Sequence, residues 1–137
     1  MKSPSRAASL ATLLAVVAGG ALAAAAVVSA LLPRRRRLQH IVSLRFKDTA
    51  DGVQIATLEA GFRALERAIP EVKALSWGHN TSREGRSRGL THVFVLSFDT
   101  PSDVEAYLVH PAHTQFVEQL LPHLADVLVV DFTPHQG

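Results

Sequence analysis

A tyrosine and two histidines lie within seven residues of one another in the stretch from Tyr107 to Phe116. A neutral imidazole can take a proton from a carbon acid or a hydroxyl, and a phenol can donate a hydrogen bond to a developing oxyanion. Pro111 has no N–H to continue a helix, so one helix should end near His110 and another should begin there. His113 then falls at helical spacing with apolar residues and turns inward. His113 is therefore a candidate general base, and Tyr107 a candidate oxyanion donor.

Two further histidines, His40 and His92, lie in segments where residues alternate as they do in half-buried strands. Both share the face that carries the large apolar side chains. We expect them to join Tyr107 and His113 in one pocket, and a hydrogen-bonded core histidine is the alternative at each position. His110 is a candidate pocket residue or a cap for the helix that ends there. The other histidines are expected on the surface or in loops: His79, His123 and His135.

A metal site at the same corner is an alternative, because His110 and His113 have His-x-x-His spacing. Pro111 interrupts the helix between them, and no inward carboxylate is evident among the pocket candidates. The nearest acidic residue is Asp131, which alternates with Phe132. The sequence therefore predicts neither a metal nor a cofactor.

The elements that must position these residues follow from periodicity and from helix-breaking residues. Alternation predicts strands over residues 38–46, 72–78, 91–98 and 126–132. Apolar residues at helical spacing predict a helix that Pro70 closes, and a second helix should start at a cap on Thr100 or Ser102. The order β-α-β-β-α-β is typical of the α+β ferredoxin-like fold, an antiparallel four-stranded sheet with helices on one face.

The face of the sheet away from the helices is expected to be apolar. Ile41, Val93 and Val95 alternate onto it, and we expect Val127 and Val129 to join them. A monomer rarely exposes an apolar patch of that size. The sequence therefore predicts a homodimer in which two sheets pack across a two-fold axis to form an α+β barrel.

The chain of 137 residues has room for one domain and a tail. Residues 1–38 hold six basic side chains and no acid, which leaves eight basic against twelve acidic side chains in the remainder. A mildly acidic domain argues against binding to nucleic acid, which needs clustered Lys and Arg. Disulfides, thiol catalysis and Cys-type zinc sites are excluded because the chain has no cysteine.

Residues 7–32 carry no charge and are long enough to cross a bilayer as a single helix. We interpret residues 1–37 as a membrane anchor with a basic flank, or as a signal segment, and residues 38–137 as the folded domain. Arg34 to Arg37 follow the span, which favours a cytoplasmic domain. The alternatives are a secretory signal cleaved near Ala23 or an organelle transit peptide, which would make the domain secreted or organellar.

Five short motifs together carry a family resemblance. They are His-Ile-Val-x-Leu-x-Phe-Lys at 40–47, Trp-Gly at 77–78, Gly-x-Thr-His at 89–92, Tyr-x-x-His-Pro-Ala-His at 107–113 and Val-Val-Asp-Phe at 129–132. Residues 38–134 thereby resemble the stress-responsive A/B barrel (Dabb) family of the dimeric α+β barrel superfamily.

The resemblance implies a small-molecule pocket. In a plant polyketide cyclase of this family, the residues matching Tyr107 and His113 carry an aldol-type ring closure, and those matching His40 and His92 line the pocket. That cyclase has a pocket tyrosine where this chain has Phe62, so Phe62 is expected to line the pocket. The resemblance is compatible with three functions: a cofactor-free cyclase or lyase, a non-catalytic ligand-binding or stress-protective module, and a haem-handling or monooxygenase-type protein.

Overall fold

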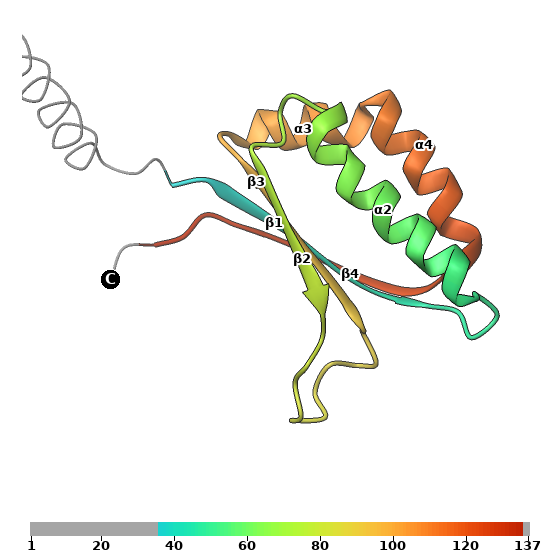
Figure 1. Cartoon of the computed structure of the whole chain (residues 1–137). Helices are drawn as coiled ribbons and strands as arrows, with labels where there is room; N and C mark the ends of the chain where they lie inside the picture. The colour runs from blue at the N-terminus through green and yellow to red at the C-terminus, as the bar shows by residue number, and fades with distance from the viewer. Residues whose placement is uncertain (1–35, 136–137) are drawn as a thin grey trace, which may run out of the picture. The chain divides into compact units, whose positions relative to one another are not determined.

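The computed structural model describes residues 36–135, and it contains one antiparallel sheet whose helices all cover the same face (Figure 1). The predicted ferredoxin-like fold is confirmed. In chain order the elements are β1 (Leu38–Phe46), α2 (Gly52–Ala68), β2 (Ala74–His79), β3 (His92–Phe98), α3 (Pro101–Val109), α4 (Pro111–Leu120), the 3₁₀ turn η1 (Leu121–His123) and β4 (Leu124–Phe132).

Local sequence signals fix the ends of the helices. Thr100 caps α3, because its hydroxyl accepts from the Asp103 backbone N–H at 3.2 Å while the Asp103 carboxylate accepts from the Thr100 N–H at 2.9 Å. Such a reciprocal pair satisfies two backbone donors that a helix start leaves free. His110 is the C-cap residue of α3, and Pro111, which follows it directly, is the first residue of α4. The predicted helix-helix corner is thus confirmed.

The strands are ordered β2-β3-β1-β4, and all neighbours are antiparallel. His40, Val42 and Leu44 of β1 are buried on the helix-covered face, together with alternate residues of β3. Residues directly opposite each other in antiparallel strands share a face. The register therefore decides which side chains of the edge strand β4 meet the helices.

The prediction for Val127 and Val129 was wrong. Val129 lies opposite Val42 and Val127 opposite Leu44, so both face the helices. Leu128 and Val130 instead take the open face. The open face is apolar as predicted, but with different residues of β4: Ile41, Val93, Val95, Leu128 and Val130.

Among residues 36–135, no helix is both long enough and apolar enough to cross a bilayer. The predicted anchor, residues 7–32, lies outside the described residues. The membrane anchor therefore stays a prediction from the sequence.

Candidate functional site

A cavity of about 320 Å³ lies between the α3–α4 corner and strands β1 and β4. Its volume falls in the range of small-molecule sites. Its polar lining residues are His40, Tyr107, His113 and Asp131, and every other lining residue is apolar. Two of the three predicted pocket histidines and the tyrosine are thus brought together. The carboxylate of Asp131 is a polar group that the sequence prediction had not included.

His113 reaches the cavity from the first turns of α4. Its Nδ1–H donates to the backbone carbonyl of Leu108 at 3.1 Å, because a carbonyl oxygen can only accept. In the neutral ring, Nε2 therefore carries the lone pair. Burial lowers the pKa of His113 below its ordinary value, and the electrostatic effect of the neighbouring His40 imidazole lowers it further, while the hydrogen bond to the Leu108 carbonyl opposes both effects. The ring is thus a neutral proton acceptor near pH 7.

Tyr107 of α3 is 1% exposed, and its ring packs against both cavity histidines. The ring centroids lie 4.4 Å from His113 and 5.7 Å from His40. Burial raises the pKa of the Tyr107 phenol, so the hydroxyl keeps its proton. Burial is the cause of this shift and no hydrogen bond from residues 36–135 contributes to it, so the proton is available to a ligand.

His40 lies opposite Asp131 in the β1–β4 ladder, and its Nδ1 lies 2.6 Å from a carboxylate oxygen of that residue. The imidazole is 4% exposed, whereas the Asp131 side chain is 45% exposed. A carboxylate that accepts from Nδ1–H fixes the tautomer and orientation of the ring. His40 therefore presents Nε2 as its free nitrogen, next to Tyr107.

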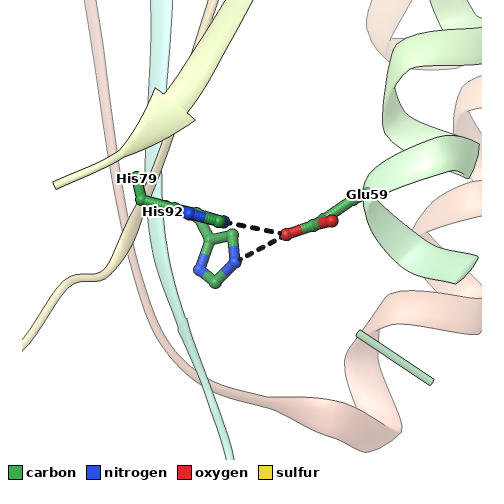
Figure 2. A group of neighbouring side chains, drawn as sticks. All are labelled: Glu59, His79 and His92. Carbon is green, nitrogen blue, oxygen red and sulfur yellow. Dashed lines mark hydrogen bonds and ion pairs between the residues drawn. The ribbon is translucent and has the colours of Figure 1, made fainter. Parts of the chain in front are cut away.

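His92 does not line this cavity. It lies opposite Leu44 in β1, four residues along the strand from His40, which corresponds to about 13 Å at ~3.3 Å per residue. There its Nε2 lies 3.0 Å from a carboxylate oxygen of Glu59. The Nε2 atom of His79 lies 3.0 Å from the same oxygen (Figure 2). His79 was expected in a loop or on the surface; it ends strand β2 and remains exposed.

This second cluster also shifts the pKa values of its members. Burial alone would raise the pKa of Glu59, but hydrogen bonds from His79 and His92 lower it overall. The pKa of His92 is lowered chiefly by burial, against the opposing hydrogen bond to Glu59. Glu59 and Asp131 show that the expectation of no inward carboxylate was wrong. The sequence offered one signal: Glu59 precedes Phe62 by three residues and so lies beside the apolar stripe of its helix.

The two remaining candidates have different positions. Phe62 lines the cavity as predicted and stacks on Phe94 with ring centroids 3.8 Å apart. His110 is not a cavity residue: its Nδ1 accepts from the Ala112 N–H at 3.1 Å and so caps the start of α4. The alternative of a capping role is therefore the one that describes His110, although its side chain caps the start of the second helix rather than the end of the first.

Comparison with known proteins places this geometry in a family. The model of the Stress responsive A/B Barrel Domain matches residues 38–134, which include every strand and helix described above. The chain belongs to the stress-responsive A/B barrel family. The resemblance carried by the five short motifs is thereby confirmed.

Several members of the A/B barrel family are similar over most of their length. Stress-response A/B barrel domain-containing protein HS1 of Arabidopsis thaliana is 35% identical over 97 residues, which are 71% of this chain and 89% of HS1. Olivetolic acid cyclase of Cannabis sativa is 26% identical over 99 residues, which are 72% of this chain and 98% of the cyclase.

Solved structures agree with the fold. A crystal structure of an Arabidopsis thaliana protein is 34% identical, with a TM-score of 0.70, and covers 73% of this chain and 97% of its own. A Thermobifida fusca protein described as dimeric and ferredoxin-like is 26% identical, with a TM-score of 0.63, and covers 76% of this chain and 96% of its own.

Proposed function

We propose that this A/B barrel domain is a cofactor-free enzyme that closes a ring in a small β-ketoacyl substrate bound in the 320 Å³ cavity. The observation that carries the proposal is the orientation of His113. Because its Nδ1–H is held by the Leu108 carbonyl, Nε2 is the basic nitrogen. A buried, neutral imidazole beside a protonated phenol is a base and acid pair suited to carbon-acid chemistry.

In the proposed reaction, Nε2 of His113 takes a proton from the CH₂ group between two carbonyls of the substrate. The resulting carbanion attacks a distant carbonyl carbon of the same molecule, and a carbon–carbon bond forms. The Tyr107 hydroxyl donates a hydrogen bond to the oxygen on which negative charge develops. Protonation of that oxygen by the imidazolium returns His113 to its neutral form, and loss of water then completes an aldol-type condensation.

The lining of the cavity supports an apolar substrate with a few carbonyl oxygens. Its walls are apolar except at the Tyr107–His113 pair and at the His40–Asp131 pair. Phe62 supplies a further apolar wall, so we expect an apolar group of the substrate at that side. Olivetolic acid cyclase, at 26% identity, supports the reaction class and leaves the substrate open.

The proposal is tested with His113→Ala, and His123→Ala serves as the control because it removes an imidazole outside the cavity. Purified protein is incubated with a linear tetraketide thioester, and ring formation is followed by chromatography. Loss of general-base catalysis should lower turnover by about 10²–10⁴-fold in His113→Ala while the circular dichroism spectrum is retained. Equal turnover in His113→Ala and the wild type would overturn the assignment.

A non-catalytic binding module is the second candidate, and the largely apolar cavity lining favours it. In that case a hydrophobic ligand raises the melting temperature of the wild-type protein and is recovered unchanged. Turnover of the thioester by the wild type excludes this alternative. The same incubation therefore separates the two functions.

We also propose that the protein is a homodimer held at a membrane by residues 7–32. The apolar open face supports the dimer, as does the description of the Thermobifida fusca relative as dimeric. The uncharged leader supports the anchor. The full-length chain should sediment with membranes and resist extraction at high pH, and release by such extraction would contradict the anchor.

A further inference from the structure

We infer that Glu59, His79 and His92 form a binding site for a divalent first-row transition metal ion, with zinc as the representative ion. The three side chains come from separate elements, α2, β2 and β3, and point toward a common centre (Figure 2). One ligand atom from each lies within 4.8 Å of the other two. Two imidazoles and one carboxylate are the protein ligand set of several open, three-ligand zinc sites.

The distances suit such an ion after a small adjustment. Both histidine Nε2 atoms lie 3.0 Å from Oε1 of Glu59. Ligand bonds of about 2.0–2.1 Å in tetrahedral geometry place neighbouring ligand atoms about 3.3 Å apart. The nitrogen-oxygen separations thus need to widen by only a few tenths of an ångström. The His79 side chain is 64% exposed, so it is free to bring its nitrogen into position.

The fold holds two of the ligands in place without the ion. His79 lies directly opposite His92 in the β2–β3 ladder, so both imidazoles project from the same face of adjacent strands. The two rings pack edge to face with centroids 4.7 Å apart. Glu59 approaches from α2, which covers that face, and its side chain is 16% exposed. The site is therefore built on rigid elements, as precise metal sites are.

A neighbouring hydroxyl can accommodate the change of tautomer that metal binding requires. Without the ion, Nε2–H of His92 donates to Glu59. With the ion, Nε2 must offer its lone pair, and the proton moves to Nδ1. Thr91 Oγ1 lies 2.8 Å from Nδ1 and 3.4 Å from the Leu44 carbonyl, so it can accept from the ring and donate to that carbonyl. Such an outer hydrogen bond is typical of metal-bound histidine.

The chemistry of the ligands selects the class of ion. Two imidazole nitrogens favour zinc, copper, nickel or iron, whereas magnesium and calcium prefer sites made wholly of oxygen. The three residues leave at least one position of the ion to water, because His79 forms the exposed side of the cluster. None of the three lines the 320 Å³ cavity, so the inference does not depend on the proposed ring closure.

The test uses the full-length chain, freed of metal with a chelator and dialysed. Zn²⁺ is titrated in competition with a chromophoric chelator, and Co²⁺ is added separately to record its visible absorption bands. We expect one Zn²⁺ per chain, and cobalt bands of the intensity that four-coordinate nitrogen and oxygen ligation gives. His79→Ala removes an exposed ligand and leaves the core intact, so it should weaken zinc binding more than about 10-fold. Glu59→Gln should weaken it as well.

His135→Ala is the matched control, because it removes an exposed imidazole remote in sequence from the cluster. It should bind zinc as the wild type does. Equal zinc affinity in the wild type and His79→Ala would overturn the inference, as would weak binding of several zinc ions per chain that His135→Ala also reduces. Mg²⁺ at the same concentrations should leave the zinc titration unchanged, and competition by Mg²⁺ would refute the proposed class of ion.

Discussion

Replacing Tyr107 with phenylalanine should separate catalysis from stability. The ring is 1% exposed and lies within 5.7 Å, between centroids, of Phe98, His40 and His113, and phenylalanine keeps all of these contacts. No hydrogen bond from residues 36–135 contributes to the pKa of the phenol, so we expect that no internal bond worth about 1 kcal/mol is lost. The free energy of unfolding should change by less than about 1 kcal/mol.

Turnover should respond quite differently to Tyr107→Phe. Removing one donor from a developing oxyanion costs about 10²–10³-fold in rate, or ~2.7–4 kcal/mol in the activation free energy. Urea unfolding and turnover of the tetraketide thioester measure the two quantities on the same preparation. Tyr107→Ala provides the contrast, because it deletes the ring and should cost ~3–5 kcal/mol of stability.

The reasoning on Tyr107 would be refuted by either of two results. Unchanged turnover in Tyr107→Phe would show that the hydroxyl does not act in the reaction. A loss of more than about 2 kcal/mol in stability would show that the hydroxyl supports the fold instead. The first result would leave the phenol as a packing residue, and the second would give its hydroxyl a structural role.

Three further predictions address the base, a helix cap and the open face. The catalytic rate should fall as the pH drops through the pKa of His113, with a midpoint below pH 6.5 in the kcat/KM profile, because burial lowers that pKa and only the neutral ring accepts a proton. Thr100→Ala should lower the free energy of unfolding by about 1 kcal/mol and the melting temperature by about 4–8 °C, since it removes the cap of α3. Val130→Lys should dissociate the dimer and so halve the mass measured by analytical ultracentrifugation, because it places a charge on the apolar open face. Ala106→Lys, at an exposed position of α3, should leave the dimer intact.

The elements of the fold could be predicted because their signals are local. The alternation from Leu38 to Phe46 predicted β1 with its observed bounds, and Pro111 predicted the corner between α3 and α4. The face of the sheet on which each side chain of β4 lies could not be predicted in the same way. Residues 127–130 are all apolar, so no alternation of apolar and polar residues shows which of them face the helices. Only their pairing with β1 decides it.

The candidate site could be predicted only in part, because alternation shows which face a residue of a strand occupies but not its neighbours on that face. Alternation correctly placed His40 and His92 on the helix-covered face, but it says nothing about position along that face. Register does: His40 lies opposite Leu96, whereas His92 lies opposite Leu44. The carboxylates of Glu59 and Asp131 each approach a histidine from a distant part of the chain, 33 and 91 residues away. The position of Glu59 beside the apolar stripe of its helix indicates that it lies near the core, but no local pattern shows which histidine either carboxylate meets.

The same face of the sheet thus carries two polar clusters with an aromatic layer between them. Phe94 lies opposite Val42, which is midway along β1 between His40 and Leu44. Its ring stacks on Phe62 of α2 and on Trp77 of β2. These stacked rings separate the two clusters along the sheet. The cavity cluster has a neutral base and a protonated phenol, whereas the second cluster places a carboxylate between two imidazoles. The ring closure and the metal binding that we propose would therefore use different side chains of one small domain, on either side of this aromatic layer.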